Sequence, residues 1–243
     1  MKMFGQNQVI DTDFSRTGSM WLSQSPYQYK FYRFDGGPVA VNLRGRFCIA
    51  VLNGRLTVGD SVLDRENQFL FFEGHLESLT ATEPDTQFVA IGLASSIAAP
   101  DLRLLPVDAK KVEKPWGYEI WVVGPAHGFA FKKIFIKAKT KTSLQFHEKK
   151  IETNFIYDGR VRLHYAPKKD GHSSVQADVD IESAELNSGA IIHVLPFTIH
   201  RLEALTDLMC YEASTVELDD VIRISDDNNR PSGFIASEHN GKK

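Results

Sequence analysis

Four residues in the second half of the 243-residue chain have the types and the spacing of a metal site. Gln145 and His147 stand two positions apart, and residues at that spacing point to the same face of a β-strand. Glu152 follows at the start of the next predicted strand, and His200 lies far downstream, where it could close the set. The donors would be one amide oxygen, two imidazoles and one carboxylate.

This donor set predicts a site for one divalent metal ion. Because it lacks a thiolate, it suits Zn, Fe, Mn, Co or Ni, and it leaves coordination positions open for a substrate. His147, Glu152 and His200 alone would form a triad of two histidines and one carboxylate. The alternative is that Gln145 and His147 are surface residues of a lysine-rich loop. We favour the metal site because a hairpin glycine, Gly159, and the later His200 complete the pattern.

The elements that would position these residues are β-strands. Short apolar runs alternate with Gly, Asn, Asp and Pro throughout the chain. Asn53-Gly54 and Asp158-Gly159 are strong hairpin signals, because both residues of each pair tolerate positive φ. The predicted strands are Tyr27–Phe34, Phe47–Leu52, Arg55–Val58, Ser61–Leu63, Gln68–Phe72, Glu77–Ala81, Phe88–Leu93, Tyr118–Val123, Ala130–Ala138, Lys141–Phe146, Thr153–Tyr157, Arg160–Tyr165, Ala190–Val194, His200–Glu203 and Leu208–Ser214.

Helical periodicity is nearly absent, although Ser95–Leu105 and Leu218–Ile222 could each hold one helical turn. The two halves of the chain repeat one pattern loosely: strand, glycine turn, strand, spacer and two further strands. Two copies of an antiparallel barrel explain this repeat better than one large sandwich, and closure removes exposed strand edges. We therefore predict an all-β protein made of two tandem barrels.

The predicted domains are an N-terminal barrel over 1–104, a C-terminal barrel over 112–230 and a flexible tail over 231–243. The first barrel is predicted to bind no metal, because its equivalent hairpin, Arg44–Gly54, contains no histidine and no acidic residue. His75 stands alone there and is more typical of a hydrogen-bonded structural histidine.

Composition limits the function classes. Hydrophobic residues make up 42% of the chain and charged residues 24%, which is typical of a folded globular protein. The net charge of −3 argues against a nucleic-acid partner. No apolar run reaches the length of a membrane span, and the N-terminal segment lacks the apolar core of a signal peptide. With only Cys48 and Cys210, no disulfide framework is expected, so we predict a cytoplasmic protein.

The spacing of the four candidate ligands resembles the two sequence motifs of the cupin superfamily, with Gln145 in place of the usual first histidine. The resemblance implies that both barrels are cupin barrels, also called double-stranded β-helices or jelly rolls. The chain would then be a bicupin with one divalent metal ion in its C-terminal barrel.

More specifically, residues 112–230 resemble type II mannose-6-phosphate isomerase, the cupin part of mannose-1-phosphate guanylyltransferase. The matching stretches, in the family's order, are Val112–Glu119, Thr142–His147, Glu152, His200–Glu203 and Asp219–Arg230. The chain departs from the family in the histidine-rich run after His147 and in the loop Leu195–His200. The metal site therefore carries over better than the substrate site.

Basic residues near the predicted barrel mouth are candidate contacts for an anionic substrate. Lys132 and Lys133 stand where the family carries a basic pair, and one of them must enter an apolar strand face. Arg201 is a further candidate. His193, on the strand that leads to His200, and Lys133 are candidate catalytic groups, while the catalytic base stays unassigned. The alternatives are a solvated lysine face and a buried structural histidine.

The leading hypothesis is a mannose-6-phosphate-isomerase-like enzyme, an aldose–ketose isomerase that acts on an anionic, phosphorylated sugar. The metal would polarise the carbonyl and hydroxyl oxygens and ease removal of the adjacent C–H proton. Two alternatives stay open: an Fe(II)-dependent, dioxygenase-type cupin, and a non-catalytic bicupin that binds a sugar or metabolite. Because cupins commonly pair through their barrel faces, we also expect a homodimer.

Overall fold

The computed structural model describes residues 2–4, 7–11, 18–21, 26–65, 68–95, 101–167, 180–233 and 235. Within these residues the chain forms β-strands and one short 3₁₀ helix, η1 (Pro125–His127), so the predicted all-β class is confirmed. Most of the predicted tail over 231–243 lies outside the described residues. No helix in the described part of the chain is long and apolar enough to cross a membrane.

The chain divides into two compact units. The C-terminal unit comprises Met1–Thr12, Lys110–Trp121 and Ala130–Lys243, and the N-terminal unit comprises Asp13–Ala109 and Val122–Phe129. This division differs from the predicted boundaries of 1–104 and 112–230, because the first residues of the chain belong to the C-terminal unit. The cause is strand pairing, since β2 adds to the edge of that unit's sheet at β18.

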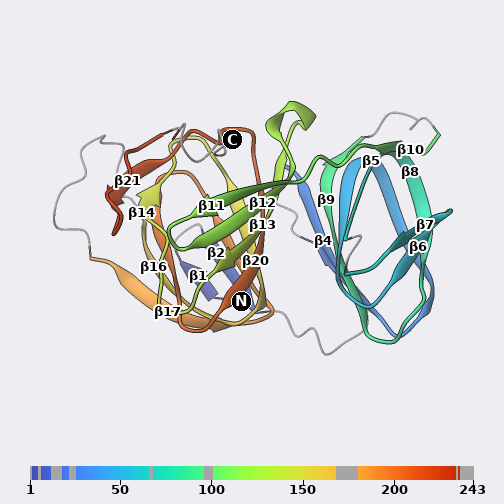
Figure 1. Ribbon diagram of the computed structural model, residues 1–243, viewed down its shortest axis with the longest axis horizontal. Helices are drawn as coiled ribbons and strands as arrows, with labels where there is room; N and C mark the ends of the chain where they lie inside the picture. Colours follow the sequence, from blue (N-terminus) through green and yellow to red (C-terminus); the bar gives the residue numbers. More distant parts are fainter. Residues whose placement is uncertain are drawn as a thin grey trace. The chain divides into compact units, whose positions relative to one another are not determined.

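The N-terminal unit is a curved antiparallel sheet (Figure 1), with the strand order β3-β4-β9-β5-β8-β6-β7 and with β10 paired to β8. Its strands are β3 (Gly18–Trp21), β4 (Gln28–Phe34), β5 (Gly37–Asn53), β6 (Leu56–Val58), β7 (Ser61–Leu63), β8 (Phe69–Ala81), β9 (Thr86–Ala94) and β10 (Arg103–Leu105). Alternate residues of β5, β8 and β9 form an apolar core, in which Phe47 and Phe72 stack at 6.2 Å.

Two sequence predictions for this unit were wrong in detail. Gln68–Phe72 and Glu77–Ala81 belong to the single strand β8, because Gly74 pairs with Gly45 and both glycines take positive φ that lets the ladder continue. Ser95–Leu105 was expected to hold a helical turn, but 103–105 form β10. Residues 96–100 lie outside the described residues.

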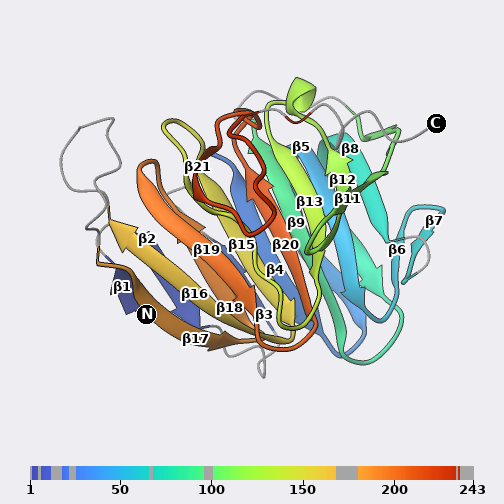
Figure 2. The same cartoon turned by 60° about the vertical axis from the view of Figure 1, so that its left-hand side comes forward.

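The C-terminal unit contains two sheets, which carry the strand orders β1-β2-β18-β15-β20-β13-β12-β11 and β17-β16-β19-β14-β21. Figure 2 shows β16 and β19 of the second sheet running side by side. The strands are β1 (Lys2–Phe4), β2 (Asn7–Asp11), β11 (Lys110–Lys114), β12 (Gly117–Val123), β13 (Ala130–Ile136), β14 (Leu144–Phe146), β15 (Glu152–Asp158), β16 (Arg160–Pro167), β17 (Glu182–Asn187), β18 (Ala190–Val194), β19 (Thr198–Ala204), β20 (Leu208–Ser214) and β21 (Ile222–Ser225).

Side chains from both sheets of the C-terminal unit share one apolar core. Ile134, Ile156 and Ile192 come from the first sheet, and Leu163 and Leu202 come from the second. They occupy alternate positions of their strands, which is the pattern expected where two sheet faces pack together. The core thus fixes which residues of β13, β15 and β19 face the interior.

The last part of the C-terminal unit differs from the sequence prediction. Leu218–Ile222 forms a turn that leads into β21, rather than a helical turn. The backbone N–H of Leu218 donates to Val216 O and that of Val221 donates to Asp219 O. This segment continues into β21, which pairs with β14, the strand that carries Gln145.

Candidate metal centre

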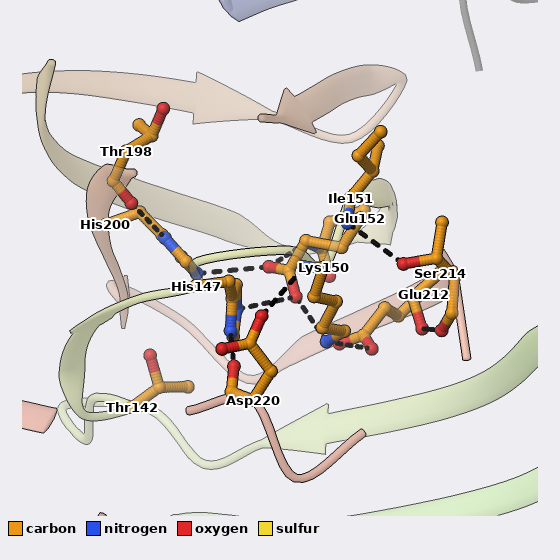
Figure 3. Close-up of polar contacts among 12 residues, drawn as sticks. Thr142, His147, Lys150, Ile151, Glu152, Thr198, His200, Glu212, Ser214 and Asp220 are labelled. Atoms are coloured by element: carbon orange, nitrogen blue, oxygen red, sulfur yellow. Dashed lines mark hydrogen bonds and ion pairs between the residues drawn. The ribbon is translucent and has the colours of Figure 1, made fainter. Parts of the chain in front are cut away.

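Three of the four predicted ligands meet in the interior of the C-terminal unit. His147 follows β14, Glu152 opens β15 and His200 lies on β19, and their ligand atoms all lie within 4.8 Å of one another. Nε2 of His147 is 3.3 Å from Oε2 of Glu152, and Nε2 of His200 is 3.1 Å from Oε1. Figure 3 shows both imidazoles pointing toward the carboxylate. All three side chains are buried.

The tautomers of the two histidines suit a metal. Nδ1 of His147 faces the backbone carbonyl of Asp220, and Nδ1 of His200 lies 3.0 Å from the carbonyl of Thr198. A carbonyl oxygen only accepts, so each Nδ1 carries the hydrogen and each Nε2 presents a lone pair. Among the described residues neither buried Nε2 makes a hydrogen bond, although each lies near Glu152. Such an arrangement is typical of metal-ligating histidines.

The titration of these groups also favours metal binding. Burial lowers the pKa of His147, so its imidazole is neutral, as a ligand must be. Burial raises the pKa of Glu152, but the neighbouring Lys150 outweighs this and holds it well below the usual value. At neutral pH Glu152 is therefore a carboxylate and His147 a neutral imidazole, the forms in which both can bind a divalent ion.

Gln145 lies close to this triad in the ladder of strands. It pairs directly with His200 between β14 and β19, and it lines the same cavity as Glu152 and His200. Its assignment as a fourth ligand stays a prediction.

A buried lysine holds the carboxylate of the triad. Nζ of Lys150 is 2.6 Å from Oε2 of Glu152 and 3.0 Å from Oε1 of Glu212. Burial lowers the pKa of Lys150, but the two carboxylates outweigh it and raise that pKa above its usual value. Asn154 donates to the other oxygen of Glu152 over 3.2 Å. Lys150 thus stays charged and bridges the metal triad and a second carboxylate (Figure 3).

The ion pairs continue beyond Glu212. Nζ of Lys132 is 3.7 Å from Glu212 and 3.5 Å from Glu119, and it lies 4.6 Å from the centre of the Trp121 ring. Trp121 donates from Nε1 to Glu119 over 2.6 Å, and Lys114 lies 3.8 Å from Glu119. Burial raises the pKa of Glu119, but the two lysines and the indole outweigh it and lower the pKa to about 2.

These groups surround a polar cavity of about 100 Å³ inside the C-terminal unit. Three lysines and three glutamates line it, together with His200 and Gln145. All six charged residues of this connected series of ion pairs line the cavity: Lys114, Lys132, Lys150, Glu119, Glu152 and Glu212. The cavity has the size of a site for a small molecule rather than a macromolecule.

The sequence left open whether Lys132 or Lys133 faces the interior, and the structure of β13 decides between them. Lys132 lines the cavity, on the face of β13 that also carries Ile134 and Ile136. Lys133 points to the opposite face with Phe135, because side chains alternate along a strand. The structure therefore brings Lys132 to the candidate site and does not bring Lys133 there.

The structure also does not bring His193 or Arg201 to the cavity. His193 pairs with Thr153 in the ladder of β15 and β18, so it shares the face turned away from Glu152, and its Nδ1 is 2.8 Å from the Thr153 hydroxyl. Arg201 donates from Nη2 to the carbonyl of Ser225 over 3.1 Å, which ties β19 to β21. Arg201 therefore connects two strands and does not line the cavity.

The carboxylates that complete the ion pairs, Glu119 and Glu212, were not predicted from the sequence. Glu119 and Glu212 stand inside the predicted strands Tyr118–Val123 and Leu208–Ser214, among apolar residues. A charged residue on an apolar strand face is itself a signal for a buried ion pair, because burial without a partner is costly. Their partners could not be named, since the register that sets Lys132 opposite Glu212 joins distant segments.

No protein-family model matches the chain, and no curated protein matches its sequence. Solved structures do. A structure of oxalate decarboxylase determined for its substrate binding mode and reaction specificity is similar with a TM-score of 0.62 at 11% identity, over 92% of this chain and 81% of the other. The oxalate decarboxylase of Lactobacillus farciminis in a formate complex has a TM-score of 0.59 at 11% identity, over 92% and 90%.

A third similar structure, from work on the Mn(II) centres of Bacillus subtilis oxalate decarboxylase, has a TM-score of 0.54 at 12% identity, over 83% of this chain and 72% of the other. Likeness at this level of identity shows the fold alone. The chain has the two-barrel cupin fold that the sequence predicted. The comparisons do not support the more specific resemblance to mannose-6-phosphate isomerase.

Proposed function

We propose that this chain is a metal-dependent enzyme that interconverts an aldose and a ketose carrying an anionic, phosphorylated group. The observation that carries the proposal is the buried triad of His147, Glu152 and His200, whose ligand atoms lie within 4.8 Å of one another beside a cavity with three lysines. The motifs in residues 112–230 that resemble those of a sugar-phosphate isomerase support the same substrate class.

The charges around the cavity favour an anionic substrate. Five cationic side chains, the three lysines with Arg223 and Arg230, line the cavity against four carboxylates, the three glutamates with Asp219. A bound divalent ion would leave this enclosed region with an excess of positive charge. In an enclosed cavity, where water screens charges less than in bulk solvent, such an excess attracts a phosphate, a carboxylate or the negative charge that develops in an isomerisation.

A divalent ion held by His147, Glu152 and His200 would supply Lewis-acid polarisation of the carbonyl and hydroxyl oxygens of the substrate. The ammonium of Lys150, held charged by two carboxylates, stabilises the negative charge that forms when the C–H proton beside the carbonyl is removed. Lys132, on the same cavity wall, attracts the anionic group.

The reaction also needs a base that moves one proton between neighbouring carbons. Glu212 lines the cavity and has no place in the metal triad, and Lys150 and Lys132 hold its carboxylate toward the interior. We assign it this role: its carboxylate takes the proton from the hydroxyl-bearing carbon and returns it to the former carbonyl carbon, while the hydroxyl proton passes to the former carbonyl oxygen.

The metal is tested first. Protein purified without a chelator or metal-affinity tag should contain about one divalent ion per chain, by mass spectrometry of the metal. The His147→Ala and His200→Ala variants should lose it. A wild-type protein that stays metal-free after incubation with Zn, Mn, Fe, Co and Ni salts would contradict the proposal and favour a binding protein without a metal.

The reaction is tested next, with sugar phosphates in heavy water. Isomerisation exchanges the C–H hydrogen beside the carbonyl with solvent, which NMR detects directly. We expect Glu212→Gln to lower kcat by about 10²- to 10⁴-fold while it retains the metal, because Glu212 is the proposed base and is not a member of the triad. Glu148→Gln is the matched control, since that side chain is exposed. Exchange at the wild-type rate in Glu212→Gln would exclude Glu212 as the base.

A second candidate function is oxygen-dependent chemistry with Fe(II). The specific observation in its favour is the triad itself, since two histidines and one carboxylate are the ligands of many non-haem Fe(II) oxygenases. Consumption of O₂ by the Fe(II)-loaded protein with a carboxylate or sugar substrate, and no C–H exchange without O₂, would favour this candidate.

A further inference from the structure

We infer that Asp220 is a positioning residue of the metal centre, which presets His147 with its Nε2 lone pair toward Glu152. The inference rests on the metal site of the proposed function, but not on the isomerase reaction. It concerns a residue that lies outside the triad and acts through two different groups, its backbone carbonyl and its carboxylate.

The backbone carbonyl of Asp220 fixes the tautomer of His147. Nδ1 of His147 donates to this oxygen, so the hydrogen of the ring is held away from the metal site. The partner lies 73 positions further along the chain, so the hydrogen bond forms only when the C-terminal segment is docked. In contrast, Nδ1 of His200 donates to Thr198 O, which lies on the same strand.

The carboxylate of Asp220 fixes the turn between two of the ligands. Oδ1 accepts from the backbone N–H of Glu148 over 3.1 Å, and Oδ2 accepts from those of Lys149 and Lys150 over 2.6 and 2.9 Å. These three amides form the link between His147 and Glu152. Three hydrogen bonds to one carboxylate set the path of this link, and thereby the separation and orientation of both ligands.

The segment that carries Asp220 is itself pinned to the barrel. We call residues 216–233 the C-terminal strap. Its strand β21 pairs with β14, and Arg230 of the strap bonds Ser143 over 2.9 Å. Leu218, Asp219 and Val221 of the strap line the cavity. Figure 3 shows Asp220 beside His147, so one segment both closes the cavity and orients a ligand.

The decisive measurement is the tautomer of each histidine in the metal-free protein, by ¹⁵N NMR of the imidazoles. We expect His147 and His200 of the wild-type protein to carry hydrogen on Nδ1. Asp220→Ala keeps the backbone carbonyl but removes the carboxylate that holds the link from 148 to 150 against residue 220. The ring of His147 should then no longer be held against that carbonyl, so it should become a mixture of tautomers. His200 should not change, because its partner is local, and it serves as the internal control.

Metal affinity is the second readout. We expect Asp220→Ala to weaken the binding of Zn²⁺ or Mn²⁺ by about 10- to 100-fold, the range found for outer partners of metal-binding histidines. Asp220→Asn keeps one acceptor oxygen and should restore part of the affinity. The matched control is Asp227→Ala, which removes another strap carboxylate that pairs with Lys141 and Arg201 and does not contact His147. That variant should bind metal as the wild type does.

The outcomes separate this inference from the proposed function. Asp220→Ala with an unchanged His147 tautomer and unchanged metal affinity would overturn the inference, whatever the activity. A wild-type His147 with its hydrogen on Nε2 would overturn it as well. If the protein shows the expected tautomer and affinity changes but isomerises no sugar, only the proposed reaction fails. If Asp220→Ala does not fold, Asp220→Asn carries both measurements.

Discussion

Lys150 sits between two buried carboxylates, which makes its charge more important than that of an exposed lysine. Without it, Glu152 would lose its lysine partner in the interior, and Glu212 would keep only the longer contact with Lys132. We predict that Lys150→Met destabilises the metal-free protein by about 3–5 kcal/mol, the usual cost of breaking a buried ion pair on one side. Urea unfolding measures this.

Lys149→Met is the control for that substitution, because the Lys149 side chain is exposed and only its backbone N–H bonds Asp220. It should unfold at nearly the wild-type urea concentration. Because a divalent ion would replace part of the missing charge, added metal should recover some of the stability lost in Lys150→Met. Equal stability of the two variants without metal would show that Lys150 is not needed to neutralise the carboxylates.

Glu119 gives a pH prediction. The pKa of Glu119 is about 2 in the folded protein, whereas the ordinary value, expected in the unfolded chain, is 4.5. The unfolded chain therefore binds the proton more readily. The stabilisation from its ion pairs is thus complete above about pH 4.5 and is lost as the pH falls through about 2. Below pH 4.5 the free energy of unfolding of Glu119→Gln should fall less steeply than that of the wild type. The two slopes should differ by about 1.4 kcal/mol per pH unit.

Urea unfolding of wild type and Glu119→Gln at several pH values between about 7 and 3 measures this difference in slope. Glu119→Gln should also be less stable at neutral pH, because Lys132 and Lys114 lose their charged partner. Parallel pH profiles for the two proteins would mean that Glu119 titrates normally in the folded state.

At the scale of residues, the sequence predicted ligands better than their surroundings. His147 and Glu152 stand close together in the chain, on the two sides of the short link between β14 and β15, so their relation follows from local spacing. The contacts of Lys150 with Glu212 and of His147 with Asp220 join segments more than 60 positions apart. No local pattern encodes such a register, which is set by the way the strands pair.

At the scale of elements, a glycine fixes the hairpin that carries part of the cavity wall. Gly117 joins β11 to β12 with φ of +154°, and a Cβ there would lie 2.0 Å from the carbonyl oxygen of Phe135. We predict that Gly117→Ala destabilises the protein by about 2 kcal/mol or more, since neither backbone can move without breaking strand pairing. Gly124→Ala is the control, because a Cβ at Gly124 meets nothing within 4 Å.

Thermal unfolding compares the two alanine variants directly, and equal midpoints would contradict the prediction. Among the elements, short, mostly apolar strands that follow turn residues were predicted with their observed bounds, as at β18 and β20. β21 was missed, because Ile222–Ser225 is short and forms a strand only through its pairing with β14. Strand formation there depends on a distant partner rather than on the segment itself.

At the scale of the whole molecule, the internal repeat predicted two units, but not the exchange of segments between them. Lys2–Phe4 and Asn7–Asp11 have no counterpart in the repeat, so nothing in the sequence assigns them to the C-terminal unit. They belong there because β2 pairs with β18 over four residues, Ala190 to His193. A strand added to a sheet edge can come from any part of a chain.

The division into units predicts how the whole chain responds to metal. Within the described residues, the cluster that could hold an ion lies in the C-terminal unit. A ligand that binds only the folded state stabilises it by about 2.7 kcal/mol at a hundredfold excess over Kd. Trp116 and Trp121 belong to this unit, so in a Trp21→Phe background their fluorescence reports its unfolding.

We therefore predict that metal raises the unfolding midpoint seen by the fluorescence of Trp116 and Trp121, and that His147→Ala abolishes this shift. If the two units unfold separately, calorimetry should show a second transition, that of the N-terminal unit, whose midpoint does not depend on metal. Binding stabilises only the unit that must be folded to hold the ion. If they unfold together, both probes should move by the same amount. A fluorescence midpoint that stays constant at saturating metal would contradict a metal site in the C-terminal unit, whatever ion is used.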